Sequence, residues 1–291
     1  MVSFGYRIWF LRQRGLRYAF ILLARKLWLK HASVTFNGRR YIVPTDDMSL
    51  ELIRDDEPWM VPLLLKLLPH APGVFVDVGV NIGQTLARVK AVEPGRRCVC
   101  FEPNPECCQV LRGLMELNDY GDVRLIHAAL ADKAGTVELH VDERADVRGS
   151  IIAGFRDNMK PAKHTIQVPM VDGRSLLDSD LSDTVGFIKI DVEGAELEVL
   201  RGLRPVIERD RPVILFELLG TGSTDPAIKS LREARQTQLL GLFPEMKYEL
   251  RRLLPDLKLE EFGEPAEYPE QSMCNYLAIP TERLSHIQAL L

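Results

Sequence analysis

Short apolar runs alternate with amphipathic stretches through the middle of the chain. The apolar runs predict buried strands at 74–78, 97–101, 123–126, 185–190 and 213–218, and a closing strand at 274–279. The stretches between them predict helices at 84–92, 106–117 and 195–201. Strands that alternate with helices of this length favour an α/β fold, with a mostly parallel sheet covered by helices on both faces.

The flanking segments follow other patterns. Alternating residues around Asn37-Gly38 predict a hairpin over 33–43. Residues 48–69 are expected to be helical, with interruptions at Pro58 and Pro62, and residues 134–141 read as a glycine-punctuated hairpin. Residues 142–170 lack strong periodicity and are a candidate lid or acceptor-binding element, whereas 221–270 is expected to be largely helical and charged. We therefore divide the chain into an N-terminal helical and hairpin extension, 1–69, and a main domain, 70–291.

Charge distinguishes the start of the chain from the rest. Residues 1–45 hold nine Lys or Arg and no Asp or Glu, which leaves 28 basic against 41 acidic residues from position 46 onward. Residues 4–30 predict a basic amphipathic helix, which could pack on the main domain or on a second subunit, or lie on an anionic membrane surface. The acidic main body is a poor match to nucleic acid, so we expect no nucleic-acid partner.

The spacing of the cysteines and the length of the longest apolar run near the start bear on the cellular location of the protein. The five cysteines form no C-x-x-C pair, which favours a reduced protein. The longest apolar run near the start, 18–24, is far shorter than the roughly 20 residues that cross a bilayer. We expect a cytoplasmic protein, with residues 4–30 available for peripheral contact with the inner face of a membrane.

The segment VFVDVGVNIGQT, 74–85, carries the first chemical signal. A strand ends near Asp77, and Gly79 and Gly83 flank Asn81, which predicts a tight loop where the backbone can approach a ligand. Asn81 breaks the G-x-G-x-x-G fingerprint of dinucleotide-binding loops. Glu102 follows the next strand, 23 residues after Gly79, where an acid can accept hydrogen bonds from ribose hydroxyls. A nucleotide-like cofactor is predicted, and a nicotinamide remains an alternative.

The segment FIKIDVEGAELEVL, 187–200, carries the second signal. It places Lys189 inside an apolar strand, Asp191 at its end and Glu193 in the following turn, while Glu217 ends the next strand. Because neighbouring parallel strands end at the same edge of a sheet, Lys189 and the carboxylates are expected to converge beside the cofactor. Glu196 has the spacing of a helix cap that is reciprocal with Glu193.

Together with FEPNP (101–105), HAALADKAG (127–135) and PVILFEL (212–218), these segments resemble the FkbM family of S-adenosylmethionine-dependent methyltransferases. The resemblance runs from about residue 39 to 218 and resumes at 275–277; it covers neither 1–33 nor 241–270. It implies a class I methyltransferase, a Rossmann-like fold of seven strands. It also implies a cofactor site, with the methionine part of S-adenosylmethionine along Asp77, Gly79, Asn81 and Gly83, the ribose at Glu102, and the adenine near Asn104, Ala128 and Ala129.

The reaction implied by the family is O-methylation of a hydroxyl on a sugar, in a glycan or glycolipid, or on a natural product. A sugar hydroxyl is a very weak acid, so a positioned base or a metal is expected. Asp191 is the first candidate for the catalytic base, followed by Glu193 and Glu217, with Lys189 holding the carboxylates in place. Mg²⁺ is less favoured because Lys189 raises the cost of a second cation, so no metal ligand is assigned. The alternative functions are a nucleotide-dependent oxidoreductase and a non-catalytic, membrane-tethered binding module.

Overall fold

The computed structural model describes residues 29–36, 38–45, 57–141, 149–152, 164–262, 269–270 and 273–291, together with positions 23, 26, 27, 52 and 267. Most of the expected basic helix, 4–30, therefore lies outside the described residues. In the part of the chain that is described, no helix is long and apolar enough to cross a membrane.

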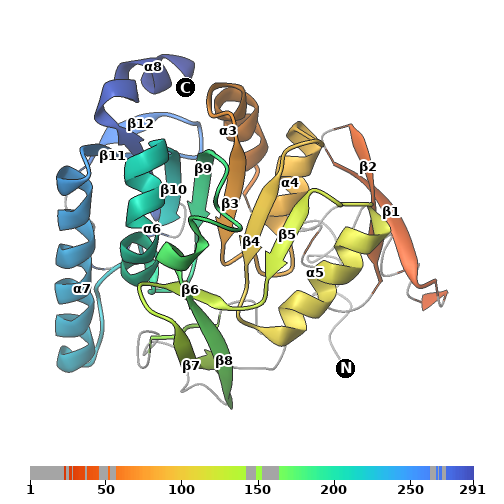
Figure 1. Ribbon diagram of the computed structural model, residues 1–291, viewed down its shortest axis with the longest axis horizontal. Helices are drawn as coiled ribbons and strands as arrows, with labels where there is room; N and C mark the ends of the chain where they lie inside the picture. The colour runs from red at the N-terminus through yellow and green to blue at the C-terminus, as the bar shows by residue number, and fades with distance from the viewer. Residues whose placement is uncertain are drawn as a thin grey trace, which may run out of the picture.

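A central eight-stranded sheet organises the fold (Figure 1). Its strands, in spatial order, are β12 (Leu259–Glu261), β11 (Tyr248–Leu253), β13 (Asn275–Pro280), β10 (Val213–Glu217), β9 (Val185–Ile190), β3 (Val74–Val78), β4 (Cys98–Phe101) and β5 (Val123–Ile126). From β10 to β5 all neighbours are parallel, whereas β13 is antiparallel to both of its neighbours. The expected α/β fold is confirmed, and the short β12 adds an eighth strand to the seven predicted.

Two apolar layers cover the sheet because alternate residues of each strand point to opposite faces. Phe75 and Phe187 pack on one face with the helices α3 (Met60–Leu67), α4 (Gln84–Val92), α5 (Pro105–Leu117) and α8 (Leu284–Leu290). Val76 and Ile188 pack on the other face with α6 (Glu196–Asp210) and α7 (Pro226–Glu245). The short 3₁₀ turns η1 (Leu68–His70), η2 (Gly173–Leu176) and η4 (Thr281–Arg283) lie in the connections between these elements.

A separate small sheet lies at the lower edge of the view in Figure 1. Its strands differ from one of the sequence predictions. Its order is β6 (Ala129–Ala131), β8 (His164–Asp172) and β7 (Gly135–Val141). The expected hairpin at 134–141 is instead one strand, β7, which pairs antiparallel with β8. The partner was missed because it lies across a long insertion, and β8 also occupies the end of the segment that showed no periodicity.

The C-terminal region also differs from its prediction. Within 221–270, α7 is helical as expected, but β11 and β12 are strands. In β11 the buried positions Tyr248, Leu250 and Leu253 are interrupted by Arg251 and Arg252, so the strand period is hidden in a charged sequence. Strand β11 is held in the sheet by pairing with β13. This long-range contact cannot be predicted from the sequence of β11 itself.

The N-terminal hairpin is confirmed. Strands β1 (His31–Phe36) and β2 (Arg39–Pro44) pair with Phe36 opposite Arg39, which leaves the predicted two-residue turn, and Gly38 has φ +72°. The Asn118 side chain accepts from Ile42 N at 2.9 Å and donates to Ile42 O at 2.8 Å, which fastens β2 to the end of α5. The region 48–69 contains one described helix, α3, with Pro62 in its first turn, where a missing N–H costs nothing.

Candidate active site at the carboxyl edge of the sheet

The loop after β3 lies directly against the end of β9. Gly79 N donates to Phe101 O at 3.0 Å, and the glycine has φ +82°. A Cβ at this position would lie 1.9 Å from the Asp191 carbonyl oxygen, so only glycine fits. Gly83, with φ +102°, then begins α4 against the side chain of Leu111. These contacts explain why the sequence places glycine at both positions.

Glu102 is fixed between two loops. Its Oε2 accepts from Asn81 N at 2.9 Å and its Oε1 accepts from Asn104 N at 2.8 Å. Burial raises the pKa of Glu102 to about 7, although the two backbone donors oppose the shift. The carboxylate is therefore oriented by the backbone of both predicted cofactor loops.

Asp77 is a buried carboxylate on β3. Its side chain is completely buried, and neither oxygen has a hydrogen-bond donor among the described residues. Burial raises the pKa of Asp77 to about 6, Lys189 lowers it, and Asp191 and Glu57 raise it further. A buried acceptor without a donor is costly to the fold, which points to a ligand or solvent donor at this place.

Lys189 lies beside Asp77 at this edge and forms an ion pair with Asp191. It lies opposite Asp77 in the strand register, is 6% exposed, and donates from Nζ to Asp191 Oδ2 at 2.9 Å. Burial lowers the pKa of Lys189, but the carboxylates of Asp191, Asp77 and Glu57 outweigh burial and raise it above its ordinary value. Lys189 is therefore charged at neutral pH and counters the negative charge around it.

The strand register also brings Glu217 close to Asp191. Phe216 of β10 pairs with Ile190 of β9, so the next residue of each strand lies at the same carboxyl edge. Burial raises the pKa of Glu217 well above its ordinary value, and the Asp191, Glu193 and Glu196 carboxylates raise it further, while Lys189 lowers it. Carboxyl groups in such different surroundings can divide acid and base roles between them.

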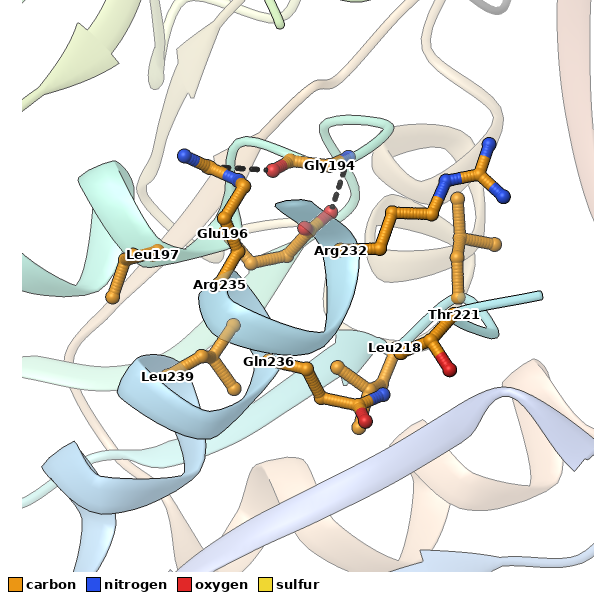
Figure 2. Close-up of a pocket in the computed structure, with 10 residues that line it drawn as sticks. Gly194, Glu196, Leu197, Leu218, Thr221, Arg232, Arg235, Gln236 and Leu239 are labelled. Carbon is orange, nitrogen blue, oxygen red and sulfur yellow. Dashed lines mark hydrogen bonds between the residues drawn. The ribbon is translucent and has the colours of Figure 1, made fainter. Parts of the chain in front are cut away.

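The turn after Asp191 has an unusual backbone. Glu193 and Gly194 are both left-handed, with φ values of +52° and +106°. Glu196 accepts from Gly194 N at 3.1 Å (Figure 2), and burial raises the pKa of Glu196 to about 7. The helix-start role predicted for Glu196 is found in this contact with the Gly194 amide. Figure 2 also shows Arg235 of α7 donating to Gly194 O.

The residues predicted near the adenine lie beside this site. Asn104 Oδ1 accepts from Glu106 N at 3.0 Å and so caps α5. Ala128 and Ala129 are buried at the start of β6. The His127 ring lies 3.2 Å from Pro103 O, which joins the two loops.

Two charged residues at the site were missed from the sequence. Glu57 pairs with Arg88 of α4 at 3.0 Å, and its charge reaches both Asp77 and Lys189. Arg88 is only 4% exposed, although its helix is amphipathic. A buried Arg on an apolar helix face was the one available signal. Among the described residues, no three His, Cys, Asp or Glu side chains are placed to hold a metal ion.

The sequence matches a known protein family. The model of the family described as "Methyltransferase FkbM domain" matches residues 77–254, which include the loop after β3 and the Asp191 turn. Methyltransferase sdnD of Sordaria araneosa is 30% identical over 164 residues, covering 47% of this chain and 62% of that protein. The 2-O-methyltransferase NoeI of Sinorhizobium fredii is 26% identical over 165 residues, covering 51% of this chain and 64% of that protein. The match thus spans less than two thirds of either relative.

Among solved structures, the methyltransferase FkbM from Methylobacillus flagellatus is similar, with 16% identity and a TM-score of 0.44. The similarity covers 80% of this chain and 55% of that one.

Proposed function

The chain belongs to the family of FkbM methyltransferase domains, and from this membership we propose that it transfers a methyl group from S-adenosylmethionine to a hydroxyl oxygen. The observation that carries the proposal is the pair of buried carboxylates, Asp77 and Glu102, on either side of the Gly79–Gly83 loop. One carboxylate has no donor among the described residues, and the other is oriented by two backbone amides.

The residues present fit the proposed cofactor. Asp77 offers two acceptor oxygens to a cationic donor such as an ammonium group, and the ionised cluster of Asp77, Asp191, Glu57, Lys189 and Arg88 is net negative. Glu102 would accept hydrogen bonds from the two hydroxyls of a ribose. Gly79 and Asn81 would line the methionine part, and the Asn104 and Ala128–Ala129 backbones would lie at the base.

Asp191 is the proposed catalytic base. When bound, S-adenosylmethionine supplies an already activated methyl group, so the protein must align the acceptor and remove its proton. Asp191 would take up the proton that the acceptor hydroxyl loses when it receives the methyl group. Lys189 keeps Asp191 in place through the 2.9 Å contact, and Glu193 and Glu217 orient the acceptor.

The proposed acceptor is a hydroxyl of a sugar or natural product. O-methylation is supported by the resemblance to a relative named as a 2-O-methyltransferase. The proposed base is Asp191, and Lys189 already counters the carboxylates at this edge, so the proposal includes no metal. Activity that survives thorough EDTA treatment is therefore expected.

A labelled transfer assay tests this function. The chain is incubated with methyl-labelled S-adenosylmethionine and panels of methyl glycosides, oligosaccharides, glycolipids and hydroxylated natural products, and products are identified by mass spectrometry. Asp191→Asn is expected to lower transfer by about 100-fold or more, because a general base contributes on that scale. Its affinity for the cofactor should fall much less than transfer does, because Asp77 and Glu102 remain in place.

Asp256→Asn is the matched control, because Asp256 also contacts a lysine, at 2.6 Å, but lies on the surface far along the chain. Equal transfer by Asp191→Asn and the control would remove Asp191 from the mechanism.

A further inference from the structure

The turn that carries the catalytic candidates is held from two sides by residues outside the family's motifs. We propose that Arg235 and Ser150 are positioning residues that lock the Glu193–Gly194 backbone so that Asp191 and Glu193 face the acceptor. The inference rests on the proposed methyl-transfer function and adds two residues to its machinery.

Arg235 reaches the turn from α7. Its Nη2 donates to Gly194 O at 2.9 Å, as Figure 2 shows. The same guanidinium binds Glu198 of α6 with both nitrogens, at 2.8 and 2.5 Å. This bidentate ion pair with Glu198 fixes the plane of the guanidinium and therefore the direction in which Nη2 donates to Gly194 O. The side chain is also shielded, with 16% of its surface exposed.

Ser150 reaches the turn from a segment paired with β7. It is 2% exposed, and its Oγ donates to Glu193 O at 2.7 Å. Its own backbone is held by β7, because Ser150 and His140 exchange backbone hydrogen bonds of 2.9 and 3.1 Å. The same Oγ accepts from Ile152 N at 3.1 Å. Ser150 therefore joins the small sheet to the catalytic turn.

The two residues hold consecutive carbonyl groups. Ser150 binds the carbonyl of Glu193, Arg235 binds that of Gly194, and Glu196 binds the Gly194 amide. Such anchoring matters because Glu193 is a non-glycine residue in the left-handed region, which the chain leaves readily unless its surroundings fix it. Release of the turn would move the Asp191 and Glu193 carboxylates together.

Arg235→Met tests the α7 side of this arrangement, and Arg204→Met is its matched control. Arg204 also joins α6 to α7, pairing with Glu208 at 2.8 Å and Glu245 at 3.0 Å, but none of its recorded contacts reaches the turn. Ser150→Ala tests the other side. Its control is Ser175→Ala, which removes a 2.7 Å hydrogen bond to the backbone carbonyl of Asp172, the last residue of β8.

Three readouts separate positioning from general stability. Calorimetry gives the Kd for S-adenosylmethionine, deuterium uptake reports on the peptide spanning residues 187–200, and the transfer assay gives kcat and KM. Arg235→Met and Ser150→Ala should lower kcat by about tenfold or more, because small misplacement of reacting groups has effects of that size or larger. The Kd should change less than about threefold. Deuterium uptake in the turn should rise, and Arg235→Lys, which keeps a donor, should recover part of the loss.

The controls should match the wild type in kcat and in uptake by the turn. If Arg235→Met and Arg204→Met behave alike in both readouts, the positioning role is wrong. If the wild-type chain methylates no acceptor in the panel, the proposed function fails separately, and the locked turn is then judged by deuterium uptake. Faster uptake with Arg235→Met and Ser150→Ala alone supports it, and unchanged uptake overturns it.

Discussion

Asp77 is the residue that most closely links folding to the proposed function. It is buried without a hydrogen-bond donor among the described residues, and burial raises its pKa to about 6. A cation that binds the ionised carboxylate must therefore displace a proton in mildly acidic solution. Glu102, with a pKa raised to about 7, is a second buried carboxyl group at the site that is partly protonated near neutral pH.

We predict that the affinity for S-adenosylmethionine falls as pH falls. Both carboxylates are ionised well above pH 7, and Glu102 and then Asp77 take up protons as the pH drops through about 7 and about 6. Each protonation weakens binding by up to about tenfold per pH unit below its pKa. Calorimetry from about pH 8 to about pH 5.5 measures the slope, and Asp77→Asn should make it shallower. A pH-independent Kd would contradict the assigned roles.

The same residue predicts a conflict between stability and function. The pKa of Asp77 in the folded protein, about 6, lies above its ordinary value of 3.8. The folded state therefore binds the Asp77 proton more tightly than the unfolded state does. The stability that this proton adds is fully present below pH 3.8 and is lost as pH rises through about 6. Asp77→Asn should therefore stabilise the cofactor-free protein at pH 8, by on the order of 2 kcal/mol, while it weakens cofactor binding. Thermal unfolding with and without cofactor measures both effects. A lower Tm without cofactor would contradict the account.

At the scale of single residues, sequence and structure agree unevenly. Asp77, Gly79 and Glu102 were predictable because each directly ends or follows an apolar strand. Arg235 and Ser150 were not, because they lie 41 and 43 residues from the groups they contact. Only the packing of α7 and of the small sheet brings them to the turn.

At the scale of elements, the buried parallel strands were predicted to within a residue or so. Such strands are apolar on both faces and leave an unbroken signal. Strands β7, β8 and β11 were misread because they are half-exposed and pair with strands far along the chain. Strand β12 was missed because it has only three residues, although its partner β11 lies just before it.

The basic N-terminal segment carries a prediction of its own. Leu23, Leu27 and Leu29 are 54%, 60% and 52% exposed, beside Lys26 and Lys30. We propose that this segment binds anionic membrane surfaces, because exposed leucines and basic side chains together suit a lipid interface. The chain should float with phosphatidylglycerol vesicles more than with phosphatidylcholine vesicles, and a variant with Leu23→Ser and Leu27→Ser should float less.

Leu231→Ser is the control for this experiment, because Leu231 is 41% exposed on α7, outside the basic segment. Equal flotation of the double variant and the control would end the membrane proposal. The alternative is that the segment packs on the main domain or on a second copy of the chain.

At the scale of the whole molecule, the strand order creates the site. Strand β3 lies between β4 and β9, so the strand order reverses at β3, which is the position where ligands bind in open α/β sheets. The cofactor loop and Glu102 lie toward β4, while Lys189, Asp191 and Glu217 lie toward β9 and β10. The fold thus places a proposed cofactor site and a proposed acceptor site side by side.

Calorimetric titration with S-adenosylmethionine and, separately, with NAD tests this account most directly. We predict a Kd on the order of micromolar for S-adenosylmethionine and no measurable binding of NAD. Glu102→Gln should weaken S-adenosylmethionine binding by about tenfold or more, because it removes the charge that we propose accepts the ribose hydroxyls. Glu106→Gln, on the first turn of α5, should bind like the wild type. Preferential binding of NAD, or no binding of S-adenosylmethionine, would contradict the account.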